Sequence, residues 1–263
     1  MKSLMLLTLR GVVRDRVLHG ILATSLLFVI IPTISSFSMR QVTELSITLS
    51  LSLISFLLLV LAVFLGGTSI WKDIERRYTF SVLGLPIRRG DYLFGKFFGI
   101  AAFMVICAFI LLLAAGGVIW YSSGIYPSDR PVVWEYIVLA VAMDCMKYIL
   151  LVAISFALSS LSTSFFLPVF GTISLYFVGG ATQEAYDFIH TATGQSLPAL
   201  TRKIASALYY VLPNLSAFDF KVNAIYGVPV KGYPLLLTIG YGVVYVMILM
   251  AVSSLIFSRR EMK

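Results

Sequence analysis

Residues 45–71, LSITLSLSLISFLLLVLAVFLGGTSIW, form a stretch of 27 residues without a charged side chain. This stretch exceeds the roughly 20 residues that a helix needs to cross a hydrocarbon layer about 30 Å thick. From Lys72 onward the sequence becomes densely ionic, KDIERRYTFSVLGLPIRRGDYLFGK. The stretch therefore predicts a membrane-spanning helix, and its abrupt end at residue 71 marks one face of the bilayer.

Four further windows contain no Asp, Glu, Lys or Arg: residues 17–39, 97–128, 148–183 and 232–258. Because hydrocarbon offers no water to unpaired backbone groups, we expect these windows to be helical. The composition agrees, since 59% of the residues are hydrophobic and 12% are charged, too few polar side chains to cover a water-soluble surface. We predict an all-α membrane protein, one transmembrane domain over residues 1–263, with spans at about 18–37, 47–71, 97–121, 136–158, 165–180 and 235–257.

The distribution of Lys and Arg predicts the orientation of these six spans. Thirteen lie in the N-terminus, the second loop and the C-terminus, and six lie in the first, third and fifth loops. Positively charged residues are retained on the cytoplasmic side, so we expect both termini there. Most of the net charge of +8 is then explained by topology, and we expect no nucleic-acid partner.

Two connections carry helical patterns of their own. In residues 1–16, Arg10 and Arg14 alternate with apolar positions, which predicts either an interfacial helix in the lipid headgroups or an extension of the first span. Residues 181–234 form a long extracytoplasmic segment, and an apolar stripe within it predicts an amphipathic helix that covers either a pathway mouth or the outer surface. The stripe consists of Leu200, Ile204, Leu208 and Val211.

Within the predicted fourth span, Asp144 and Lys147 are three residues apart and share one helix face. Charges at this depth favour a polar lining or an ion relay, and a mutual pair that only stabilises packing is the alternative. An ion-coupled carrier or channel that uses this intramembrane polar pair is therefore an alternative function.

The sequence contains no recognisable catalytic or metal-binding pattern. Gly90, Gly95 and Lys96 have the spacing of a phosphate-binding loop, but Phe97 stands where a Ser or Thr should follow, and no strand precedes the motif. We predict a chance match, with Lys96 as an interfacial anchor. We expect no catalytic residue, cofactor or metal on this chain, so it is not predicted to be an enzyme.

The second loop, residues 72–96, is the remaining candidate for function. Ile74, Tyr78 and Val82 recur at four-residue intervals among polar residues, and Pro86 ends the pattern. This predicts a short amphipathic helix held below the membrane. A solvated loop would explain the arginines but not the apolar stripe.

At this loop the sequence resembles the membrane subunits of ATP-binding-cassette (ABC) exporters, specifically the ABC-2 type permease family. The matching features are an acidic pair after span two, a Thr, a Leu-rich turn ending in Pro, basic residues, and a Gly-Lys at the start of span three. In this chain they are Asp73 and Glu75, Thr79, Leu83 and Leu85 with Pro86, Arg88 and Arg89, and Gly95 with Lys96. One residue separates the two acids, where the family typically has an acidic pair.

The resemblance implies a coupling helix seated on a separate ATPase subunit, present in two copies, which would hold the ATP and Mg. It also implies a second permease chain, as a homodimer, and a bacterial cytoplasmic (inner) membrane with lipid around the spans. The substrate does not follow from it. The implied ATPase-coupling interface consists of Asp73, Ile74, Glu75, Arg76, Arg77, Tyr78, Thr79, Val82, Leu83 and Pro86.

Overall fold

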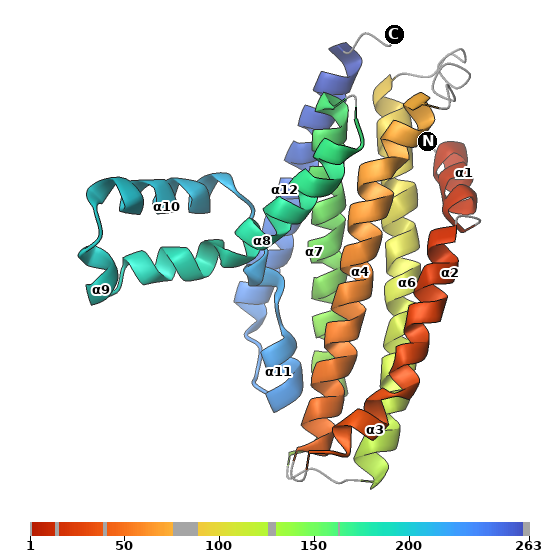
Figure 1. Cartoon of the computed structure of the whole chain (residues 1–263), viewed down its shortest axis with the longest axis vertical. Coiled ribbons are helices and arrows are strands. Elements are labelled where there is room, and N and C mark those ends of the chain that lie inside the picture. The colour runs from red at the N-terminus through yellow and green to blue at the C-terminus, as the bar shows by residue number, and fades with distance from the viewer. Residues whose placement is uncertain are drawn as a thin grey trace.

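The computed structural model describes residues 2–13, 16–38, 41–75, 89–125, 130–162 and 164–259. Every regular element in these ranges is a helix, so the prediction of an all-α protein is confirmed. Four long helices dominate the fold and run along its long axis (Figure 1). They are α4 (Val42–Glu75), α6 (Arg89–Ile125), α7 (Trp134–Leu161) and α12 (Gly232–Arg259).

Four helices in the described ranges are long and apolar enough to cross a membrane, over Val42–Asp73, Arg89–Ile125, Trp134–Leu161 and Gly232–Arg259. The chain is therefore built as an integral membrane protein. At a rise of 1.5 Å per residue, α4 is about 51 Å long and extends beyond a hydrocarbon layer of about 30 Å. These helices contain the predicted spans 47–71, 97–121, 136–158 and 235–257. The count of six spans stays a prediction.

The regions predicted as spans one and five are built differently. Residues 18–37 contain α2 (Arg16–Ser25), the 3₁₀ helix η1 (Leu26–Val29) and α3 (Ile31–Ser35) in place of one continuous helix. Pro32 lies in the first turn of α3, where its missing N–H is tolerated. The predicted span at 165–180 coincides with the first part of α8 (Phe166–Ile189), which continues past Gly179 and Gly180. Glycine lowers helix propensity, but these two glycines do not end this helix.

The core lies around α7, which is the most enclosed of the four long helices. Its Tyr148 and Phe156 are fully buried. A Cβ atom added at Gly66 of α4 would lie 2.9 Å from the Cβ of Ser155 in α7. Close approach through small residues is the usual way in which membrane helices gain packing contacts, because lipid supplies no hydrophobic drive between them.

The second half of α8 leaves the bundle sideways and returns through α9 (Ala192–Gln195) and α10 (Ala199–Val211) (Figure 1). We call residues 180–212 the arm. The Leu215 N–H donates a 3.0 Å hydrogen bond to the Gly179 carbonyl at its root. Two short helices, η2 (Ser216–Phe218) and α11 (Lys221–Tyr226), then lead to α12.

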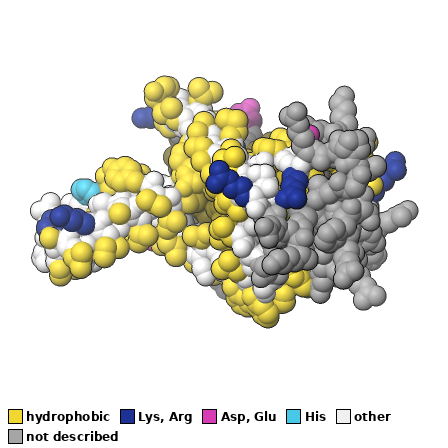
Figure 2. All heavy atoms as spheres, turned by 90° about the horizontal axis from the view of Figure 1, so that it is seen from above, with side chains coloured by type: hydrophobic (Ala, Val, Ile, Leu, Met, Phe, Trp, Pro, Cys, Tyr) yellow, Lys and Arg dark blue, Asp and Glu magenta, His cyan; other side chains and the backbone are white. Residues whose placement is uncertain are grey.

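The arm is largely apolar on its surface. Seen along the bundle axis, it projects from the body with hydrophobic sides, and basic side chains gather near its tip (Figure 2). The predicted amphipathic helix corresponds to α10, whose apolar stripe is exposed in the single chain. The stripe is therefore available to lipid or to another protein surface, and its location on the outer side of the membrane stays a prediction.

Candidate functional site

The candidate site lies at the end of the bundle where α4 stops and α6 begins. The helix α1 (Lys2–Val13) and the C-terminal end of α12 reach the same end (Figure 1). The Tyr92 ring of α6 stacks on Phe257 of α12, with ring centroids 6.2 Å apart. The Arg89 guanidinium donates a 3.2 Å hydrogen bond to the Ser258 carbonyl. The two helices that flank the predicted coupling loop are thus held by their neighbours as well as by each other.

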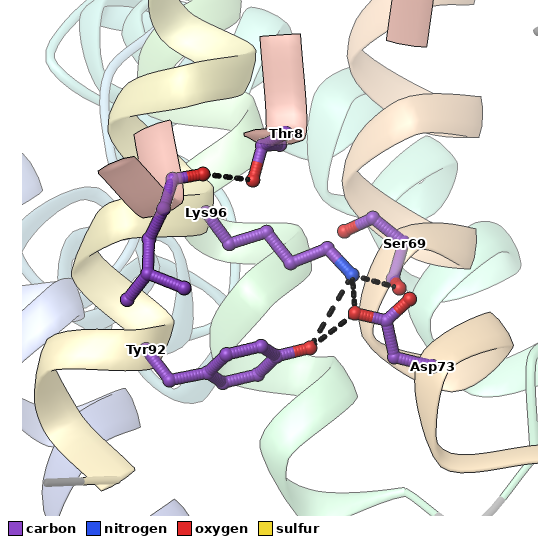
Figure 3. A network of polar contacts seen from close by, with 6 residues as sticks. Thr8, Ser69, Asp73, Tyr92 and Lys96 are labelled. Carbon is purple, nitrogen blue, oxygen red and sulfur yellow. Dashed lines mark hydrogen bonds and ion pairs between the residues drawn. The ribbon is translucent and has the colours of Figure 1, made fainter. Parts of the chain in front are cut away.

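A polar network joins α4 directly to α6 (Figure 3). The Lys96 ammonium donates hydrogen bonds to the Asp73 carboxylate and to the Ser69 carbonyl. The Tyr92 hydroxyl donates to the same carboxylate oxygen of Asp73 and lies 3.5 Å from the Lys96 Nζ. We call Ser69, Asp73, Tyr92 and Lys96 the clamp.

The clamp is a mostly buried ion pair, to which the Ser69 carbonyl and the Tyr92 hydroxyl add hydrogen bonds. The side chains of Lys96 and Asp73 are 9% and 28% exposed. Burial of a charge costs free energy unless the charge is paired and hydrogen-bonded. Asp73 and Lys96 therefore each offset the cost of burying the other. The clamp therefore fixes the last turn of α4 against the first turns of α6.

The local sequence explains how the clamp forms. Ser69 and Asp73 are four residues apart on α4, and Tyr92 and Lys96 are four residues apart on α6, so each pair lies on one helix face. Neighbouring antiparallel helices joined by a loop bring these two faces together. Lys96 was expected to anchor the helix at the lipid interface. Instead it is buried, because Asp73 offers a carboxylate within reach.

The structure describes only part of the predicted coupling interface. Asp73 lies in α4 and belongs to the clamp, so the predicted loop helix overlaps the last turns of α4. Ile74 and Glu75 end α4, but their side chains are not described. The other members lie outside the described residues: Arg76, Arg77, Tyr78, Thr79, Val82, Leu83 and Pro86.

The helix α1 packs against α6 beside the clamp, through two glycines. A Cβ atom at Gly95 would lie 2.9 Å from the Leu4 Cβ, and one at Gly99 would lie 2.7 Å from the Thr8 Cβ. The Thr8 hydroxyl is turned back onto the Leu4 carbonyl at 2.9 Å, which leaves the Thr8 methyl group near Gly99. The Gly-Lys pair at the start of α6 thus has two tasks, the docking of α1 and the clamp.

Gly99→Leu is expected to detach α1 from α6, because no leucine side chain fits against Thr8 without moving the helix. Tryptic cleavage after the exposed Arg10 should become about tenfold faster, as expected when local opening costs about 1.4 kcal/mol less. Gly117→Leu is the matched control, since a Cβ there meets nothing within 4 Å. Equal cleavage of both variants would show that the glycine contact does not hold α1.

A second polar group lies in the middle of α7. Lys147 and Asp144 form an ion pair, and their side chains are 7% and 5% exposed. The Lys147 Nζ lies 4.8 Å from the ring centroid of Tyr148, whose hydroxyl is 2.6 Å from the Ser55 Oγ of α4. The three-residue spacing of Asp144 and Lys147 in the sequence already indicated that these two side chains pair. The contact with Ser55 was not foreseen, because it joins residues 93 positions apart.

Among the described residues, no group of three or more His, Cys, Asp or Glu side chains is placed to hold a metal ion. The clamp and the polar group around Asp144 and Lys147 consist of charges and hydroxyls that hold helices together. Such an arrangement suits a protein that transmits or undergoes movement within a membrane.

Comparison with known families agrees with a protein that moves within a membrane. The sequence matches the family described as ABC-2 family transporter protein over residues 8–262. The match covers nearly the whole chain, so the chain belongs to this family, and the resemblance seen at residues 73–96 is confirmed. It is thus an ABC-2 type permease, a membrane component of ABC transport. No curated protein matches the sequence.

Proposed function

We propose that this chain is the transmembrane permease subunit of an ABC exporter, which forms the substrate pathway as a homodimer. Two copies of a separate ATPase subunit, which bind ATP and Mg, would drive it. The loop between α4 and α6 would be the part that the ATPase moves. In this proposal both termini and the loop lie in the cytoplasm, and the membrane is the bacterial inner membrane.

The clamp is the observation that carries this proposal. A loop moved by a partner performs work on a membrane domain only if its two flanking helices follow the movement. Asp73 and Lys96 join these helices immediately before and after the loop, and Tyr92 adds a third contact. Since α4 and α6 are continuous rods over 34 and 37 residues, a displacement at their clamped ends is carried across the bilayer.

The distribution of charge supports the proposed orientation. The end of the bundle with the clamp also contains the C-terminus of α12 and the N-terminal helix, and the basic residues of the sequence concentrate in these segments. If positive charge is retained on the cytoplasmic side, the loop would lie where an ATPase is available.

Tyr78→Asp combined with Val82→Asp is expected to abolish co-purification of the ATPase, because two carboxylates would be placed in the apolar stripe that seats the loop. The measurement is the amount of cassette ATPase, identified by its phosphate-binding motif, that is retained on the tagged permease. Tyr226→Asp with Val228→Asp is the control, since both side chains are exposed, one at the end of α11 and one just beyond it. Insertion of all variants in the membrane should be unchanged, and retained ATPase in the first variant would contradict the coupling role.

Reconstitution of the complex in liposomes tests the function itself. Transport should require hydrolysable ATP and should stop with a non-hydrolysable analogue. The Asp144–Lys147 pair favours the alternative, a carrier driven by an ion gradient, in which transport proceeds without ATP and responds to the gradient alone. Transport that is driven by an ion gradient without ATP would overturn the proposal.

A further inference from the structure

A cavity of about 410 Å³ lies at the root of the arm, between α7, α8 and η2. Its wall includes Lys147 of the ion pair, and its other charged residues are Glu184 and Asp219. The apolar part of the lining includes Tyr176, Phe177 and Leu215. The volume falls within the range of about 300–1,000 Å³ typical of small-molecule sites.

The cavity lies beside the middle of α7. Lys147 is the fourteenth of the 28 residues of α7, so about 20 Å of helix extends on either side of it. A hydrocarbon layer of about 30 Å that is centred on α7 would place Lys147 near the middle of the bilayer. Glu184 and Asp219 line the same cavity as Lys147 and would then lie at a similar depth, which differs from the extracytoplasmic location predicted for residues 181–234.

Glu184 and Asp219 are both exposed at the surface of the single chain. A carboxylate that faces lipid at this depth is strongly disfavoured, so charged residues within membrane segments face a water-filled space or a polar partner. The side of the chain where the arm begins therefore faces an aqueous pathway, and the cavity is a pocket in its wall.

The charge of this pocket is negative. Lys147 is neutralised by its ion pair with Asp144. The Asp219 carboxylate accepts one hydrogen bond, from the Lys221 N–H at 3.1 Å, and Glu184 has no polar contact within the part of the chain that the structure describes. Two carboxylates thus remain to receive a positively charged group, beside the aromatic rings of Tyr176 and Phe177.

The geometry points to a binding site for an amphipathic organic cation, with its ammonium group at Glu184 and Asp219 and its apolar part against Tyr176 and Phe177. Charge-assisted hydrogen bonds would fix the ammonium group, and burial of apolar surface would hold the rest of the molecule. This inference rests on the proposed function and deepens it, because it names a substrate class for the pathway.

The test is binding of dansylcadaverine, a primary ammonium compound with an aromatic group, to the purified permease in nanodiscs, measured by fluorescence anisotropy. We expect saturable binding to the unmodified chain. Dansylglycine, which carries the same fluorophore and a carboxylate, should bind at least tenfold more weakly, because it meets two like charges. Equal binding of the two probes would indicate partition into lipid or apolar surface and would overturn the inference.

Charge variants locate the site. Glu184→Gln and Asp219→Asn should each weaken dansylcadaverine binding about tenfold, as expected for loss of one hydrogen bond to a charged group. Glu184→Lys should reverse the preference in favour of dansylglycine, a gain that a misfolded variant does not show. Asp187→Asn is the matched control, because Asp187 is exposed on the same helix and does not line the cavity. If Asp187→Asn weakens binding as much as Glu184→Gln, the cavity is not the site.

The outcome is independent of the ATPase. Binding to the isolated permease needs no ATP and no partner, so a permease that fails to bind an ATPase would leave this result unchanged. Conversely, ATP-driven transport of a neutral or anionic compound, with no binding of dansylcadaverine, would remove the cation site and leave the proposed function intact.

Discussion

Lys96→Met is expected to release the clamp and to stop movement of the loop from reaching the far end of the bundle. The change removes the ammonium group that joins Asp73 to the Ser69 carbonyl, and of the contacts that the structure describes for the Asp73 carboxylate it leaves the one with the Tyr92 hydroxyl. Breaking a buried pair costs about 3–5 kcal/mol, and because Asp73 is 28% exposed we expect about 2–3 kcal/mol. Hydrogen exchange in the last turn of α4 should accelerate by on the order of tenfold or more.

Coupling is measured separately, in the complex with the ATPase. A nitroxide label on Ile125→Cys, at the other end of α6, should report an ATP-dependent change in the distance between the two permease chains. This change should be lost in Lys96→Met although the ATPase stays bound and active. Lys203→Met is the control for loss of a lysine, since Lys203 is exposed on α10.

The double variant Asp73→Asn with Lys96→Met separates stability from coupling. It removes both charges, so most of the stability should return, while the hydrogen bonds that join the helices stay weakened. Recovery of stability without recovery of the ATP-dependent movement is the expected result. If both recover together, the clamp only stabilises the fold and does not transmit force.

Asp144→Asn is expected to destabilise the protein by about 2–4 kcal/mol, because it leaves the buried Lys147 ammonium without a counter-charge. Both side chains are less than a tenth exposed. The asparagine can still accept one hydrogen bond, and the Tyr148 ring lies 4.8 Å from the ammonium, so part of the stabilisation remains. The measurement is the free energy of unfolding in mixed micelles.

Asp144→Asn with Lys147→Met is the decisive comparison. Removal of both charges should restore most of the lost stability, since a buried pair often contributes little more than apolar groups of the same volume. Asp187→Asn, an exposed carboxylate on α8, should change the free energy by less than about 0.5 kcal/mol. If the single and the double variant are equally destabilised, the two residues do not act as a pair.

The sequence singled out Asp73 and Lys96 but not their contact, and it did not single out Ser69 or Tyr92. Lys72, Asp73 and Lys96 all stand at the edges of charge-free stretches, and each by itself fits a side chain that reaches for the lipid headgroups. Charges that flank one short loop lie at the same end of two antiparallel helices. This consideration would have indicated that Asp73 and Lys96 lie near each other. Which acid meets which base depends on the rotation of each helix, and that rotation is decided by packing at positions such as Gly95 and Gly99.

Apolar stretches of more than twenty residues were sufficient to predict an all-helical membrane protein, because in hydrocarbon every backbone group must be paired within its own segment. This requirement is local, so it can be read from the sequence alone. Only the tertiary structure showed that α8 leaves the bundle and continues into the arm, that Lys96 pairs with Asp73, and that Glu184 lines the same cavity as Lys147. These features depend on contacts between segments far apart in the chain, and the energy of such contacts belongs to the packed bundle and not to any one of its helices.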